Sequence, residues 1–102
     1  MFVHTVFFWI KEGAPKDAKD KLIADCYKYL KPIPGVNQLY AAGPADRPRD
    51  VVDSSYQVGL TVIYENVEAH DVYQVHDLHE QFIARNKEHW KRVQVYDIVE
   101  GK

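Results

Sequence analysis

The chain of 102 residues predicts a single α+β domain, residues 1–102, with the element order β-α-β-β-α-β. Three observations lead to this prediction. Four segments are rich in β-branched and aromatic residues, as strands are. A long amphipathic segment follows the first of them, and a second helical region precedes the last. A chain of this length is enough for one domain but not for two.

The first strand, residues 2–11, is apolar on both of its faces. His4, Val6 and Phe8 share one face, and Phe7 lies on the other. A strand that is buried on both sides usually lies in the middle of a sheet that is covered on both faces. We therefore expect this strand to be central.

The next segment, residues 15–31, predicts an amphipathic helix. Pro15 suits the first turn of a helix. Apolar side chains then recur at helical spacing: Ala18, Leu22, Ile23, Cys26, Tyr27 and Leu30. The helix has to end before Pro32 and Pro34, because proline lacks the backbone donor that a helix interior needs.

Residues 36–42 and 55–65 predict the second and third strands, separated by a polar loop that contains prolines. Residues 67–75 predict a short helix. Asp77 is the predicted N-cap of a further helix that runs to about residue 89. Residues 92–99 predict the last strand, and the complete order is the ferredoxin-like arrangement.

This arrangement leaves one face of the predicted sheet without cover, because two helices can cover only one side. Phe7, Trp9 and Ile63 would then meet water. At about 25 cal/mol per Å² of apolar area, the cost is on the order of several kcal/mol. A second copy that packs sheet against sheet would remove this cost, so we predict a homodimer.

The composition argues against several classes of partner. Thirteen basic and fifteen acidic residues give a net charge of −2, whereas a nucleic-acid footprint needs clustered basic residues. No apolar run approaches a membrane span, and the first residues lack the features of a signal peptide. Cys26 is the sole cysteine, which suits a reducing compartment. We expect a cytoplasmic protein that binds neither nucleic acid nor membranes.

The candidate chemical site is the motif of Tyr73, His76 and His79, whose three-residue spacing places the side chains along one helical stripe. Histidine titrates near neutral pH, so His79 is the predicted catalytic base. Tyr73 would orient it or hold a developing enolate oxygen. His4, on the first strand, is predicted to be a second polar contact. The alternative for His79 and His4 is a structural role, with each imidazole hydrogen-bonded inside the core.

The remaining histidines have simpler interpretations. His76 and its neighbour Asp77 are predicted to cap the helix and bond locally. His70 and His89 are predicted to face solvent. A zinc site made by His4, His76 and His79 lacks a matching carboxylate and a His-x-x-x-His pair, so we predict no metal and no cofactor.

The predicted ligand-binding residues are mainly apolar side chains of the inner sheet face and of the two helical regions. They are Val6, Phe8, Leu22, Ile23, Cys26, Val58, Leu60, His76, Phe82 and Ile83. For the aromatic members a plain core role is the alternative. Cys26 lies on the apolar side of its helix and is expected to be inert.

Four pieces in this order resemble the stress-responsive A/B barrel domain family, one of the dimeric α+β barrel groups. They are Val3 to Lys11, Ile33-Pro-Gly-Val36, Gly59 to Glu65, and Tyr73-x-x-His76-x-x-His79-x-x-Phe82. The resemblance implies a ferredoxin-like protomer, a dimer whose two sheets form an α/β barrel, and a pocket between sheet and helices in each protomer.

The resemblance also bears on activity. Most relatives have no known activity, but olivetolic acid cyclase, a plant polyketide cyclase of this family, closes a linear polyketide by aldol condensation. Its key tyrosine and histidine look like Tyr73 and His79, and its strand-one histidine looks like His4. This chain departs from the family at Val58, where a histidine is usual, and at Asp77, where a proline is usual.

The sequence leaves two functions open. The first is an enzyme, a small cofactor-independent cyclase or lyase that binds a small, largely apolar carbonyl compound in a protomer pocket. The second is a non-catalytic, stress-related binding or structural homodimer, in which the histidines tie the helix to the sheet. Val58 favours the second, because it removes a polar group from the pocket.

Overall fold

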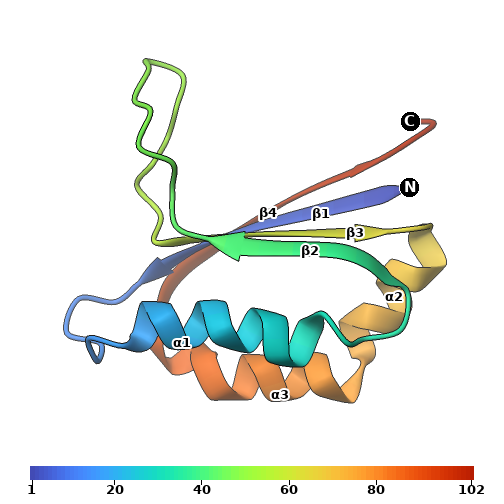
Figure 1. Ribbon diagram of the computed structural model, residues 1–102, viewed down its shortest axis with the longest axis horizontal. Helices are drawn as coiled ribbons and strands as arrows, with labels where there is room; N and C mark the ends of the chain where they lie inside the picture. Colours follow the sequence, from blue (N-terminus) through green and yellow to red (C-terminus); the bar gives the residue numbers. More distant parts are fainter.

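The computed structural model describes residues 1–102 as one four-stranded antiparallel sheet with the helices on one face (Figure 1). The predicted α+β, ferredoxin-like order is confirmed. The elements in chain order are β1 (Phe2–Ile10), α1 (Ala18–Asp25), the π-helical turn η1 (Cys26–Leu30), β2 (Val36–Ala42), β3 (Val58–Tyr64), α2 (Val67–Val75), α3 (Asp77–Asn86), the 3-10 turn η2 (Lys87–His89) and β4 (Trp90–Val99).

The strands lie in the order β2-β3-β1-β4, so β1 is central, as its two apolar faces predict. His4 stands between Val62 of β3 and Asp97 of β4 in the register. Successive residues of a strand point to opposite faces, so these three side chains share the face toward the helices. The register therefore brings a carboxylate to the side of the buried histidine.

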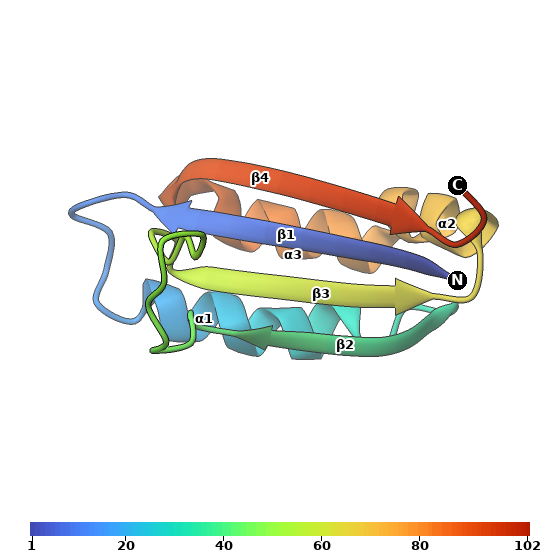
Figure 2. The ribbon, with the colours of Figure 1, turned by 90° about the horizontal axis from the view of Figure 1, so that it is seen from above.

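The helices divide the inner face of the sheet between them. Figure 2 shows α1 behind β2 and β3, and α3 behind β1 and β4, with α2 at the end of the sheet that carries the N-terminus. Below α1 and η1 the core is filled: Cys26, Leu30 and Val58 are each 0% exposed. Burial raises the pKa of the Cys26 thiol to about 12, which makes it unreactive at neutral pH.

The ends of the helices differ in part from the predictions. The first helix begins at Ala18, and Pro15 lies in the turn before it, where its carbonyl accepts the Ala18 N–H. The predicted capping role of His76 is confirmed: it is the N-cap of α3, and its Nδ1 accepts the Leu78 N–H at 3.0 Å. The prediction of Asp77 as the N-cap is wrong, because Asp77 is the first residue of the helix. At this cap a ring nitrogen accepts the hydrogen bond that a side-chain oxygen usually accepts.

The strand boundaries also shift. The third strand begins at Val58, three positions after its predicted start, and the last begins at Trp90, two positions before. Helix α3 ends at Asn86, and η2 separates it from β4. None of the helices has the length and apolar character that a membrane span requires.

A buried carboxylate joins α1 to α3. Asp25 is 4% exposed and accepts hydrogen bonds from Arg85 Nε at 2.9 Å and from Asn86 Nδ2 at 3.0 Å. Burial by itself raises the pKa of Asp25, but the hydrogen bonds from Arg85 and Asn86 outweigh it and leave the pKa below its usual range. The folded chain therefore prefers the charged form of Asp25.

We predict that Asp25→Ala lowers the free energy of unfolding at pH 7 by about 1–3 kcal/mol, because Arg85 and Asn86 lose their shared acceptor. Urea unfolding measures this change.

The pKa of Asp25 is lower in the folded chain than in the unfolded chain. The stabilisation by Asp25 is therefore complete above its unfolded-state pKa and is lost as the pH falls through its folded-state pKa. Exposed Asp20, on the same helix, is the control, and Asp20→Ala should change stability by less than about 0.5 kcal/mol. Equal effects of the two substitutions would contradict the role of Asp25.

Candidate functional site

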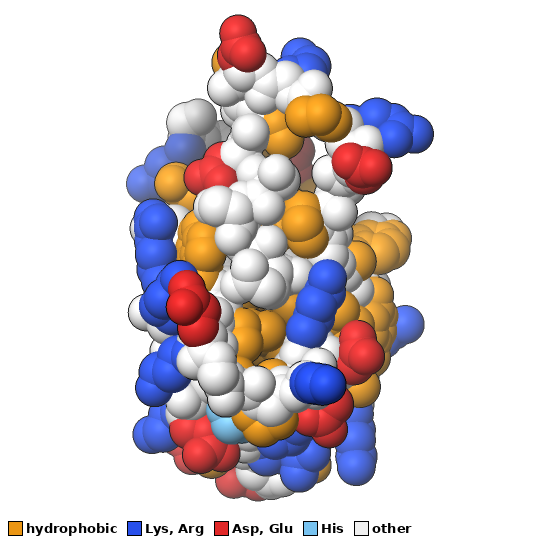
Figure 3. All heavy atoms as spheres, turned by 90° about the vertical axis from the view of Figure 1, so that its left-hand side faces the viewer, with side chains coloured by type: hydrophobic (Ala, Val, Ile, Leu, Met, Phe, Trp, Pro, Cys, Tyr) orange, Lys and Arg blue, Asp and Glu red, His pale blue; other side chains and the backbone are white.

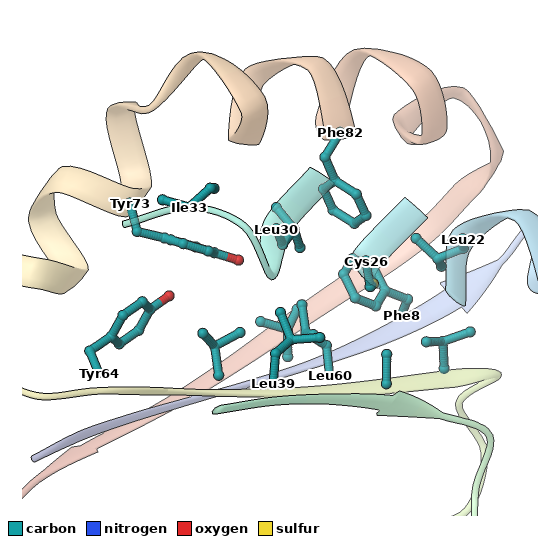
Figure 4. Packing of buried hydrophobic residues seen from close by; sticks show 14 of the residues in the cluster. Phe8, Leu22, Cys26, Leu30, Ile33, Leu39, Leu60, Tyr64, Tyr73 and Phe82 are labelled. Carbon is teal, nitrogen blue, oxygen red and sulfur yellow. The ribbon is translucent and has the colours of Figure 1, made fainter. Parts of the chain in front are cut away.

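A cavity of about 180 Å³ lies between the β1–β4 half of the sheet and the helices α2 and α3. Figure 4 shows its walls from close by: Tyr73 and Phe82 extend from the helices, and Phe8 and Leu60 rise from the sheet. The lining residues are His4, Val6, Phe8, Leu60, Tyr73, Gln74, His79, Phe82, Ile83, Trp90, Val93 and Val95. Most of them are apolar, so the few polar groups stand out.

His4 projects from the centre of β1 and is 6% exposed. Its Nδ1 lies 2.6 Å from Asp97 Oδ1, which fixes the plane of the imidazole ring. Burial lowers the pKa of His4, and this outweighs the opposite effect of the hydrogen bond and the charge of Asp97. His4 is therefore neutral at pH 7, with its ring held in one orientation.

His79 lies in the first turn of α3, and its ring centroid is 4.8 Å from that of Tyr73. Its Nδ1 is buried and has no hydrogen-bond partner within the protein. Burial lowers the pKa of His79, and the nearby imidazoles His4 and His70 lower it further. A neutral imidazole with a buried, unpaired nitrogen is costly unless something else pairs with it.

Tyr73 comes from α2, is 1% exposed, and packs edge-on against Tyr64 with ring centroids 5.1 Å apart. Both hydroxyl groups point into the space between sheet and helices (Figure 4). Burial raises the pKa of Tyr73, so the phenol keeps its proton at every physiological pH. His4 lies edge-on to the same ring at 6.0 Å. The cavity wall thus joins a phenol that can donate a hydrogen bond to imidazoles that can accept a proton.

The structure separates the predicted ligand-binding residues into two groups. Five of them line the cavity: Val6, Phe8, Leu60, Phe82 and Ile83. Leu22, Cys26 and Val58 lie outside it, in the filled core under α1, and Ile23 packs at the edge of that core. His76 is also outside the cavity, where it caps α3. Periodicity identified the inner face but not the part of it that is hollow. Contact with a ligand stays a prediction for all ten residues.

Several residues of this region were missed. Gln74, Trp90, Val93 and Val95 line the cavity, and the alternation along the last strand could have identified the two valines. The prediction that His70 faces solvent is wrong. Its side chain is 16% exposed and its ring stacks on Phe2 with centroids 4.2 Å apart. His89 is also half-buried rather than solvent-facing, with a side chain that is 24% exposed.

Figure 3 shows one end of the molecule, where Lys and Arg side chains are intermixed with Asp and Glu and with several hydrophobic side chains. Mixed charges of this kind do not form the one-sided basic face that nucleic-acid binding needs.

Known proteins of this shape support the fold. A dimeric ferredoxin-like protein of unknown function from Thermobifida fusca is 13% identical, and the match covers 96% of this chain and 89% of that chain with a TM-score of 0.81. A Dabb family protein from Mesorhizobium loti is 22% identical, with 99% of this chain and 97% of that chain covered and a TM-score of 0.78. A hydroxynitrile lyase from Passiflora edulis is 15% identical, with 99% of this chain and 94% of that chain covered and a TM-score of 0.76. Comparison with curated protein sequences gives no match. The model of the stress responsive A/B barrel domain matches residues 2–100, so the chain belongs to this family.

Proposed function

We propose that the cavity binds a small, largely apolar carbonyl compound and that the protein is a cofactor-independent lyase or cyclase acting on it. One observation carries this proposal: His4, Tyr73 and His79 line one largely apolar cavity. A few convergent polar groups in an apolar pocket are typical of a small-molecule site.

In this proposal each polar group has a separate role. His79 is neutral and takes a proton from a hydroxyl group or from a carbon next to a carbonyl. Tyr73, which stays protonated, donates a hydrogen bond to the oxygen on which negative charge develops. His4, held by Asp97, is a further polar contact for the substrate. Most of the lining is apolar, so these interactions become stronger once a bound ligand displaces water from the cavity.

The cavity volume limits the substrate. An apolar cavity of about 150 Å³ holds one benzene molecule. The cavity here, of about 180 Å³, therefore accommodates one ring with a small substituent. A longer chain has to extend through the opening. This size favours a one-ring aldehyde, ketone or cyanohydrin as the test compound, and the Passiflora edulis neighbour, a hydroxynitrile lyase, makes cyanohydrin cleavage the first reaction to assay.

The second candidate function is a non-catalytic, stress-related homodimer that only binds a ligand. Val58 favours it, because this fully buried valine stands where the family usually has a histidine. In that case the imidazoles of His4 and His79 serve to tie β1 to α2 and α3. The two candidates differ in what the loss of His79 does to turnover.

We propose that both functions reside in a homodimer formed through the outer face of the sheet. Rows of side chains cross that face, such as Ile98, Val3 and Ile63 in register. Tyr96 is 62% exposed and Ile98 is 68% exposed. The β2–β3 loop rises from the same side (Figure 1), and the Thermobifida fusca relative is described as dimeric. Exposed apolar area of this extent is typical of an interface.

We predict that His79→Ala lowers kcat for cyanohydrin cleavage or α-hydrogen exchange by about 10²–10⁴-fold, the usual contribution of a general base. Cleavage of the benzaldehyde cyanohydrin and deuterium exchange into phenylacetone, both followed by NMR, are the measurements. Because the pKa of His79 is lowered, the wild-type rate should rise with pH and level off with a midpoint below 6.5. His89→Ala, outside the cavity, is the matched control.

Equal turnover in His79→Ala and the wild type would rule out the catalytic proposal. A lower melting temperature with no turnover by either protein would favour the non-catalytic candidate. Circular dichroism of the variant distinguishes a lost base from a lost fold.

We predict that the wild-type protein sediments near twice its chain mass of 11.9 kDa at micromolar concentration. Ile98→Lys should weaken the dimer at least ~10-fold, because it buries a charge in the apolar interface. Val75→Lys is the control, since Val75 is 74% exposed but lies on α2, on the helical side. A wild-type monomer, or equal effects of the two lysines, would refute the interface.

A further inference from the structure

The ligating groups of His4, His70 and Asp97 meet at the end of the sheet that α2 covers, and they come from three separate elements. One potential ligand atom of each residue lies within 4.8 Å of the others. We propose that these three residues form a binding site for one divalent transition-metal ion of the Zn²⁺ type. The cluster differs from the set His4, His76 and His79, for which the sequence predicts no metal. His70 and Asp97 stand beside His4, whereas His76 caps α3.

The composition of the cluster suits such an ion. Two imidazoles and one carboxylate form a common ligand set for Zn²⁺, Fe²⁺ and related ions, with water in the remaining positions. Ligands about 2.1 Å from a metal are roughly 3 to 3.5 Å from one another. The Nδ1 of His4 and the Oδ1 of Asp97 are 2.6 Å apart, so they need to separate only slightly, while His70 approaches them.

The surroundings of His70 provide an independent observation. Its Nδ1 lies 3.2 Å from Asp71 Oδ1, which leaves the other ring nitrogen for a metal. A carboxylate on the second nitrogen is the usual partner of a metal-binding histidine, because it fixes the tautomer and orients the ring. The stacking of His70 on Phe2 also restricts the ring. These contacts restrict the orientation of the His70 ring, which still has to move toward His4 and Asp97 when an ion binds.

The charge and the solvent exposure of the cluster also suit a cation. Asp97 and Asp71 each pair with a histidine, and neither forms an ion pair with Lys or Arg. Two carboxylates without cationic partners make the local potential negative, which favours a cation. The side chain of Asp97 is 36% exposed and that of His4 is 7% exposed, so the cluster is open to solvent on one side only. An ion can enter from that side.

Isothermal titration calorimetry of the full chain with ZnCl₂ tests the site, with Co²⁺ absorption as a second readout. We expect one ion per chain. His70→Ala and Asp97→Asn should each weaken binding at least ~10-fold, and Asp71→Asn by about 10-fold through the orientation of His70. The control is His89→Ala, because His89 has a neighbouring carboxylate, Glu88, at 3.6 Å but is not part of the cluster.

The proposal is overturned if the wild type binds no Zn²⁺ at 1 mM (roughly the weakest affinity of a specific site), or if binding is unchanged in Asp97→Asn and His70→Ala. Loss of binding in His89→Ala to the same extent would also overturn it. If His70→Ala does not fold, Asp97→Asn and Asp71→Asn, which preserve side-chain shape, decide the question. Because the experiment measures metal binding alone, a negative result would not bear on the proposed carbonyl chemistry.

Discussion

The structure depends on how a four-stranded sheet that is apolar on both faces is covered. Its helices all lie on one side, over residues such as Val58, Leu60 and Val62, which are almost completely buried. On the other side Val3, Phe7 and Ile63 stay partly exposed, in rows fixed by the strand register. Burial of apolar area is the dominant favourable term in folding, so a small domain gains much from covering this second face. The proposed homodimer would supply this cover.

The helical layer does not cover its face evenly. Under α1 and η1 the side chains fill the space completely, whereas between α3 and β1 a cavity remains. The hollow is partly open, since Val93 and Val95 in its wall are 40% and 41% exposed. Protein interiors are normally close-packed, so this part of the inner face lacks packing partners. A bound apolar ligand would supply those contacts.

The period-two alternation of strands made much of this predictable. It identifies the two faces of β1, the inward direction of His4 and the uncovered outer face. It did not predict which part of the inner face is hollow, because that depends on the distance between helix and sheet. Leu22 and Cys26 were therefore expected in a pocket but lie in the filled core.

The outcomes around the histidines have local causes. Of the two predicted capping residues only His76 caps α3, because the short break between α2 and α3 leaves its backbone extended and its ring next to the Leu78 N–H. His70 was expected in solvent, but α2 folds back over the end of the sheet and stacks it on Phe2. Asp97 was not singled out at all, since its importance comes from standing opposite His4 in the register. Contacts of this kind join distant parts of the chain, which periodicity does not reveal.

We propose that His4 and His79 contact a one-ring carbonyl compound that enters the cavity. NMR spectra of the five histidine imidazoles during titration with acetophenone test this proposal. We expect saturable shifts for His4 and His79, and none for His89, which lies outside the cavity. Spectra in which none of the five imidazoles responds, or in which all respond equally, would contradict it.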